Sequence, residues 1–121
     1  MKDRRIYHVC RRAEWVQAAK RGAYNGRPSD AIFGFIHFSA ANQVAASIER
    51  HFAGERELLL LTVDVVRLGS ALRWEANRGG EMFPHLYGSL PVEAVLAVEW
   101  IVIGPDGRTD IPLPHDRSEA P

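Results

Sequence analysis

The sequence predicts one α+β domain whose strands and helices enclose a cleft. A chain of 121 residues is the length of a single domain, and 46% hydrophobic with 25% charged residues is a globular composition. Strand and helix patterns alternate twice and are followed by further strands, an order typical of helices packed against a sheet. Aromatic and ionisable side chains occur in several of these strands, which indicates that they converge on a ligand site.

The first part of the chain predicts a strand, a helix and a loop. Residues 6–10 (IYHVC) are rich in β-branched and aromatic side chains, and their alternation places His8 on the same face as the two end residues. Residues 12–21 have apolar side chains at helical spacing, and Gly22 is a natural C-terminal stop. Residues 24–30 (YNGRPSD) predict a loop, since glycine and proline interrupt them.

The next segment predicts a buried strand followed by an amphipathic helix. Residues 32–39 (IFGFIHFS) are almost wholly apolar, which indicates a strand buried on both faces. Residues 41–52 carry an apolar stripe at helical spacing, and Gly54 ends it. Ser39 stands at the N-cap position, where its hydroxyl would accept a hydrogen bond from the first-turn amides.

The second half predicts mainly strands. Pro84 should restrict its strand to an edge or a bulge, because proline cannot donate to a ladder. Residues 1–108 are expected to form the single domain, and the proline-rich residues 109–121 a loose tail. The expected strands are residues 57–66, which form the clearest central strand, 72–75, 83–87 and 95–103.

Charge and cysteine content limit which partners and which cellular location are expected. The formal net charge is zero, which argues against nucleic acid and anionic membranes as partners. Basic residues crowd the first 21 positions and would suit a phosphate, although a solvated surface is the commoner meaning of such a cluster. Cys10 is the only cysteine, and no signal-peptide or membrane-length apolar run is present, so a cytoplasmic protein is expected.

Residues 72–90 (LRWEANRGGEMFPHLYGSL) have the composition of a ligand site. Glu75 shares a strand face with Arg73, and the two would form either an ordinary ion pair or part of a desolvated site beside a tryptophan. Glu81 follows two glycines, which let the backbone approach a ligand, although an exposed loop acid is the plainer alternative. The candidate side chains in this stretch are Arg73, Glu75, Glu81, His85 and Tyr87.

Three histidines each have a functional and a structural interpretation. His8 and His37 lie within apolar strands, where a buried imidazole hydrogen-bonded to a backbone carbonyl would be purely structural. His85 is flanked by Pro84, which restricts the chain and aims the side chain. None of the three lies at helical or strand spacing from another, so no metal site is predicted. The nucleophile-elbow, P-loop and dinucleotide glycine motifs are also lacking.

Four segments together carry a family resemblance. They are IYHV (residues 6–9), GFIHFS (34–39), LRWE (72–75) and GGEMFPHLYG (79–88), the last being the most specific. Over residues 6–98 the chain resembles an uncharacterised bacterial family of small proteins, the domain-of-unknown-function 952 family. This resemblance implies the ADP-ribosyltransferase-like fold, in which a split, two-half β-sheet with packed helices holds a nicotinamide dinucleotide (NAD) in a central cleft.

The resemblance also implies binding roles. His8 matches the first-strand position that holds the nicotinamide ribose. Phe38 and Ser39, with His37 beside them, are similar in place to the residues that line the nicotinamide pocket.

The third position of the family fold is normally a glutamate that steadies the ribose and its oxocarbenium-like transition state. Glu75, Glu81 and the pair His85 and Tyr87 compete for it, and no glutamate stands unambiguously at a strand start. Some members of the fold instead transfer a 2′-phosphate from RNA to the dinucleotide with histidine and arginine. The basic N-terminal segment and the histidines of this chain suit that chemistry slightly better.

The expected function is therefore that of an enzyme, or former enzyme, that binds NAD or a related nucleotide and transfers an ADP-ribosyl or phosphoryl group. Glu75 or Glu81 would stabilise ribosyl cation charge, and His85 with His37 would act as acid and base or as polar wall. Phe38 or Tyr87 would stack on the base, with Arg73 also contacting the cofactor. The alternatives are a non-catalytic module that binds a small anionic metabolite, and a module that docks a protein partner on its aromatic residues.

Overall fold

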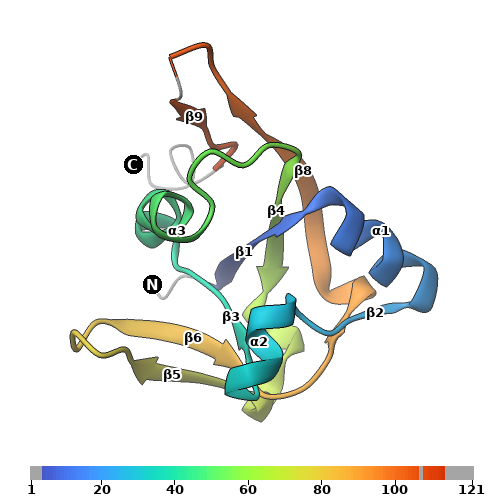
Figure 1. Cartoon of the computed structure of the whole chain (residues 1–121). Helices are drawn as coiled ribbons and strands as arrows, with labels where there is room; N and C mark the ends of the chain where they lie inside the picture. Colours follow the sequence, from blue (N-terminus) through green and yellow to red (C-terminus); the bar gives the residue numbers. More distant parts are fainter. Residues whose placement is uncertain (1–3, 107, 114–121) are drawn as a thin grey trace, which may run out of the picture.

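The protein is organised around a four-stranded antiparallel sheet in the order β1-β4-β8-β9 (Figure 1). The computed structural model describes residues 4–106 and 108–113. The strands of this sheet are β1 (Arg5–Arg11), β4 (Leu58–Asp64), β8 (Val95–Ile103) and β9 (Thr109–Asp110). Helices and further short strands surround it, so the α+β prediction is confirmed, and every pairing between described strands is antiparallel.

Strand β4 is central and apolar on both faces, as its sequence predicts. Leu59, Leu61 and Val63 point into one hydrophobic cluster together with Ile6 and Cys10 of β1. The intervening side chains point into a second cluster on the other face of the sheet, whose buried members are Tyr7, Val9, Val44, Ile48, Phe52, Leu58, Leu60 and Ile101. The two-residue alternation of strands thus divides one sheet between two cores.

The first and third helices each cover one face of this sheet. Helix α1 (Arg12–Arg21) has the predicted bounds and ends at Gly22, whose φ of 87° is the left-handed conformation that favours glycine. Helix α3 (Val44–His51) follows the short 3₁₀ helix η1 (Ala41–Gln43), so the predicted helix over residues 41–52 is confirmed.

The predicted N-cap is wrong. Ala40 is the N-cap residue, and its N–H donates to Gln43 Oε1 at 2.9 Å. Ser39 instead pairs through its backbone with Tyr7, because the chain here is still an extended segment beside β1.

Helix α2 (Pro28–Phe33) replaces part of the predicted loop over residues 24–30. Proline stands in its first turn, where no backbone N–H is needed, and Asp30 accepts the Arg27 N–H at 2.7 Å. Gly34 ends the helix with a φ of 83°. The proline in the first turn, the capping acid and the final glycine are sequence signals of a short helix. The glycine and proline content of the segment nevertheless led to a loop prediction.

The strand predicted over residues 32–39 is also mostly wrong. Only β3 (Ile36–His37) pairs as a strand there, and Ile32 and Phe33 lie on helix α2 with 82% and 61% of their surface exposed. An apolar run of this length does not distinguish a strand from a helix end. The actual break falls at Gly34, in the middle of that run.

A three-stranded sheet in the order β3-β6-β5 projects beside the first sheet (Figure 1). Strands β5 (Leu72–Ala76) and β6 (Met82–Leu86) form a hairpin; the two strands were predicted, but their pairing was not. The edge position expected for Pro84 is wrong, because β6 is the central strand. Pro84 is tolerated there since β3 ends beside it: Phe38 N–H donates to the Pro84 carbonyl at 2.9 Å, and proline has no N–H to return.

The remaining elements are short. Strands β2 (Ala23–Tyr24) and β7 (Leu90–Pro91) form a pair that the sequence did not predict. Thr109 and Asp110, expected in the tail, pair with β8 as β9, while residues 114–121 lie outside the described part of the chain. Within the described residues, no helix is long and apolar enough to cross a membrane. The 3₁₀ helices after β4 and β7 are η2 (Val65–Arg67), η3 (Gly69–Ala71) and η4 (Val92–Ala94).

Candidate functional site

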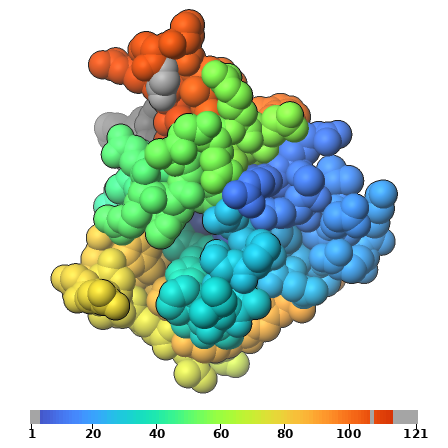
Figure 2. Space-filling view, in the orientation of Figure 1, coloured from blue at the N-terminus to red at the C-terminus, as the bar shows by residue number. Residues whose placement is uncertain are grey.

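A cleft of about 620 Å³ lies between helices α2 and α3 and the three-stranded sheet. Figure 2 shows the molecule hollowed between the green α3 segment, the cyan α2 and the yellow β5–β6 hairpin. This volume lies in the range of about 300–1,000 Å³ that is usual for small-molecule sites. The predicted cleft is therefore present.

The floor of the cleft is aromatic. His37 and His85 share one face of the three-stranded sheet because they are directly paired, and Phe35, just before β3, packs its ring against both of them. The Phe35 ring stacks on His85 with centroids 4.1 Å apart and 23° between the planes. The His37 and His85 centroids are 5.3 Å apart in an edge-to-face arrangement. Such a floor offers flat surfaces to a planar ligand group.

Asp30 anchors His37 from helix α2. The residue is 4% exposed, and its Oδ1 accepts the His37 Nδ1–H at 2.6 Å. Burial alone would raise the pKa of Asp30, but the hydrogen bonds from His37 and from the Arg27 N–H hold it below its usual value. Gly26 makes room for this carboxylate: its φ is 93°, and a Cβ there would lie 2.7 Å from Asp30 Oδ2. The aspartate is thus held ionised against one imidazole.

A second carboxylate holds His85. Glu75 Oε1 accepts the His85 Nδ1–H and the Tyr87 hydroxyl, each at 2.8 Å. These two hydrogen bonds, the one from His85 first, keep the pKa of Glu75 below its usual value. The same carboxylate raises the pKa of Tyr87, whose ring lies 5.1 Å from the guanidinium carbon of Arg73.

His8 is fully engaged beneath the cleft. Its Nδ1–H donates to the His37 carbonyl at 2.6 Å, and its Nε2 accepts the Tyr24 hydroxyl at 2.7 Å. Burial lowers the pKa of His8 despite the opposing charge of Asp30, so the ring is neutral. Burial also raises the pKa of Tyr24, which therefore keeps its proton as the donor. Both ring nitrogens of His8 are therefore already engaged, and a ligand could hydrogen-bond to one of them only by displacing Tyr24 or the His37 carbonyl.

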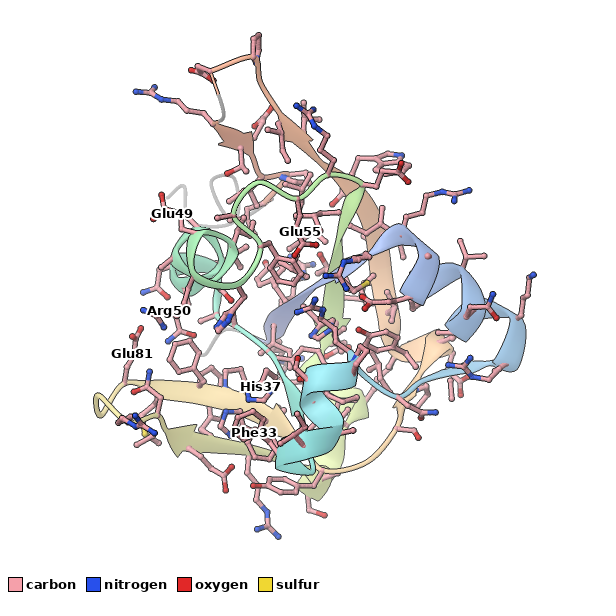
Figure 3. All side chains as sticks on the ribbon, viewed as in Figure 1. Phe33, His37, Glu49, Arg50, Glu55 and Glu81 are labelled. Atoms are coloured by element: carbon pink, nitrogen blue, oxygen red, sulfur yellow. The ribbon has the colours of Figure 1, made fainter. Side chains whose placement is uncertain are left out.

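Arginines form the wall of the cleft. Among the residues that the structure describes, Arg27, Arg50 and Arg78 line it, against two carboxylates, Asp30 and Glu81. Arg27 lies 4.2 Å over the Phe52 ring, and its Nε is buried without a hydrogen-bond partner among the described residues, although Glu14 is 3.6 Å away. Arg50, from α3, and Glu81, from the hairpin, border the cleft together with His37, as labelled in Figure 3. The wall therefore favours an anion.

Glu81 is held by the helix side of the cleft. Gln43 Nε2 donates to Glu81 Oε2 at 3.0 Å and to the Met82 carbonyl at 2.8 Å. This buried amide ties η1 to the β5–β6 hairpin. Each carboxylate at the site thus has a protein partner: His37 for Asp30, Gln43 for Glu81, and His85 for Glu75.

The structure brings most of the predicted site residues together. His8, His37, Phe38, Ser39, Glu81 and His85 line the cleft. Arg73, Glu75 and Tyr87 do not line it, but Glu75 reaches it through His85. Among the described residues, no three histidine, cysteine or acidic side chains are grouped as a metal site.

Sequence reasoning missed residues that lie in the segment predicted as a loop or on the predicted helix. Asp30 and Arg27 were assigned to the loop, although an acid at the third position after a proline-led helix start was a readable capping signal. Phe35 was considered only as a strand residue. Arg50 and Gln43 carried no signal, because one polar residue on a helix resembles any other.

Comparisons with known proteins agree on the family. The family model described as "Protein of unknown function (DUF952)" matches residues 9–98. A crystal structure of protein CC0527 from Caulobacter crescentus is 40% identical, with 88% of this chain and 93% of that chain covered and a TM-score of 0.83. The solution NMR structure of CC0527 is 40% identical over 87% of this chain and 90% of that one, with a TM-score of 0.78. No curated protein matches. The chain belongs to the DUF952 family.

Proposed function

We propose that the cleft binds a nucleotide, with oxidised NAD as the first candidate, on an ADP-ribosyltransferase-like arrangement of two sheets. The observation that carries the proposal is the combination of an arginine wall and an aromatic floor in one cleft of about 620 Å³. A nucleotide presents the complementary groups: a planar base and anionic phosphates. Arginine is well suited to phosphate because its planar guanidinium donates two parallel hydrogen bonds.

The proposed contacts follow from the positions of the side chains. The base or nicotinamide ring stacks on the Phe35 floor, since Phe38 is buried in the core, and the phosphates lie toward Arg27 and Arg50. His8 and Ser39 line the inner end, where a ribose would sit. Tyr87 and Arg73 lie outside the cleft, so they contact only the part of a ligand that extends past His85.

Group transfer is the chemical part of the proposal. An ADP-ribosyl transfer needs a carboxylate beside the forming ribosyl cation. Glu81 is the acidic candidate inside the cleft on the hairpin side, and it would have to exchange its hydrogen bond with Gln43 for one with the ribose.

A non-catalytic binding module is the second candidate. The observation that favours it is that Asp30, Glu75 and Glu81 each already accept a hydrogen bond from a protein side chain. In that case the cleft binds a small anionic metabolite and returns it unchanged.

Calorimetric titration with oxidised NAD and with ADP-ribose tests both candidates. Heat is the appropriate signal, because none of Trp15, Trp74 and Trp100 lines the cleft. We expect saturable binding of both ligands, and Arg50→Ala should weaken it by about 10- to 100-fold, as expected for the loss of a charge-assisted hydrogen bond of about 1.5–3 kcal/mol. Arg56→Ala, an exposed arginine outside the cleft, is the matched control and should bind normally.

The absence of binding at millimolar ligand, in a folded protein, would refute the nucleotide proposal. Binding that both arginine variants weaken equally would show that the contact lies elsewhere. Release of nicotinamide from bound NAD would favour the transferase, and binding with no turnover of NAD would favour the module.

A further inference from the structure

We propose that His37 and His85 are a general acid–base pair that hydrolyses a phosphodiester of a ribonucleotide bound in the cleft. The inference rests on the proposed function, because it requires a nucleotide in that cleft. It goes further by assigning the reaction to phosphorus rather than to the glycosidic carbon.

The first support is the position of the two imidazoles. His37 on β3 is directly opposite His85 on β6. Because the neighbouring pair, Phe38 and Pro84, carries the ladder hydrogen bond, the histidine pair is of the non-hydrogen-bonded kind, in which opposite side chains lie closest. The two rings, 5.3 Å apart, therefore present themselves to the same small region of the cleft.

The second support is the orientation of each ring. A separate carboxylate accepts each Nδ1–H: Asp30 for His37 at 2.6 Å and Glu75 for His85 at 2.8 Å. An anchored Nδ1–H fixes the tautomer and leaves Nε2 for proton transfer, as in histidine–carboxylate pairs of hydrolases. Within residues 4–106 and 108–113, neither Nε2 has a hydrogen-bond partner.

The third support is the composition of the surrounding charge. Asp30 and Glu75 are occupied by the histidines and Glu81 by Gln43, so a carboxylate to stabilise a ribosyl cation would first have to break a hydrogen bond. Arginines line the same cleft and suit the anionic oxygens of a phosphate. Two histidines and a cationic wall fit attack at phosphorus better than cleavage of a glycosidic bond.

The reaction balances with water as the only co-reactant. One histidine, neutral at Nε2, accepts a proton from water while the water oxygen forms a bond to phosphorus. The bond from phosphorus to the leaving ribose oxygen breaks, its electron pair stays on that oxygen, and the second histidine delivers the proton that it carried on Nε2. A diester suits this pair because the nucleophile must lose a proton and the leaving alkoxide must gain one. Solvent then restores both protonation states.

Hydrolysis of 2′,3′-cyclic AMP to the monophosphate is the direct test. The informative variants are His37→Asn and His85→Asn, because the asparagine amide can still donate near the Nδ1 position while Nε2 is lost. Each should lower kcat/KM by about 10²- to 10⁴-fold, while ADP-ribose still binds in calorimetry. Glu99→Gln, on the exposed side of β8, is the control and should leave kcat/KM unchanged.

The pH profile separates chemistry from structure. The wild type should give a bell-shaped kcat/KM, because one histidine must be neutral and the other protonated. Each asparagine variant should lose one limb, which identifies the base and the acid. Glu75→Gln, a positioning change, should move the limb that belongs to His85 without unfolding the protein. The other charged groups around the pair are Arg73, directly opposite His85 on β5, and the cleft-lining Arg27, Arg50, His51, Arg78 and Glu81.

The outcomes distinguish this inference from the proposed function. Protein that binds ADP-ribose but does not hydrolyse 2′,3′-cyclic AMP, or whose hydrolysis survives both asparagine changes, overturns the histidine pair alone. Hydrolysis that depends on both histidines, in protein that does not bind NAD or ADP-ribose, supports the pair and removes the dinucleotide. Nicotinamide release from NAD that persists in both variants also overturns the assignment to phosphorus.

Discussion

The four-stranded and three-stranded sheets have the same antiparallel pairing but different roles. Strand β4 buries leucines on both faces, so the four-stranded sheet separates two hydrophobic clusters. The three-stranded sheet buries Leu86 on one face and presents His37 and His85 to the cleft on the other, with Phe35, just before β3, packed against them. Stability is therefore expected to depend mainly on the first sheet and ligand chemistry on the second.

The two sheets meet at β1. Tyr7 and Ser39 exchange backbone hydrogen bonds of 2.8 and 2.7 Å, and His8 donates to the His37 carbonyl. The floor of the cleft is thus fixed to the stable sheet through one strand. Substitutions on either side of this join should separate stability from function.

The largest expected effect is on the core of the four-stranded sheet. Leu60→Ala removes a fully buried side chain from the second cluster and should lower the free energy of unfolding by about 2–5 kcal/mol. Leu96→Ala makes the same change on β8, where the side chain is 47% exposed, and should cost about 0.5 kcal/mol or less. Urea unfolding of the two variants measures the difference. Equal losses would contradict the division between buried and exposed faces.

A smaller effect is expected at the join between the sheets. Tyr24→Phe leaves His8 Nε2 buried without its donor and should lower the free energy of unfolding by about 1–3 kcal/mol. The matched change Tyr87→Phe removes a hydroxyl from the surface beside Glu75 and should leave the urea midpoint almost unchanged. A Tyr24→Phe variant as stable as the wild type would show that water replaces the hydroxyl.

Strands β1, β4 and β8 of the four-stranded sheet could be predicted from sequence, and particular residues show why. The leucines of β4 and the apolar stripe of α3 determine secondary structure by their spacing alone, because a strand or helix buries whichever face is apolar. Gly22 ended α1 where its conformation requires glycine. Hydrophobic periodicity was sufficient to predict those elements whose side chains only have to bury an apolar face.

The cleft was predicted less well, because its side chains are held by hydrogen bonds to one another rather than by burial in a hydrophobic core. His8, His37 and His85 were recognised as candidates, but their carboxylate partners follow from tertiary contacts between elements. Asp30 looked like a loop acid, and its burial depends on Gly26 and on a helix of only six residues. The stretch over residues 32–39 misled for a related reason: Ile32 and Phe33 are apolar yet exposed on α2.

The smallest effect is expected on the pH dependence of stability and isolates His8. Its pKa in the folded protein is below the ordinary value of 6.5, chiefly because of burial, so the unfolded chain takes up a proton first as pH falls. The contribution of neutral His8 to the free energy of unfolding is fully present above pH 6.5 and is lost as the pH falls toward the folded pKa. For one proton, the free energy of unfolding changes by no more than about 1.4 kcal/mol per pH unit.

Unfolding free energies measured from pH 7.5 down to about pH 5 test this sign. Asp30 and Glu75, whose pKa values are lowered, lose their contributions only at more acidic pH, so they do not mask it. His8→Asn keeps a donor toward the His37 carbonyl but binds no proton, and it should flatten the slope. His51→Asn should flatten it less, because burial also lowers the pKa of His51 but the residue is exposed. A slope that persists in His8→Asn would assign the acid sensitivity to another group and weaken the view that one neutral imidazole joins the two sheets.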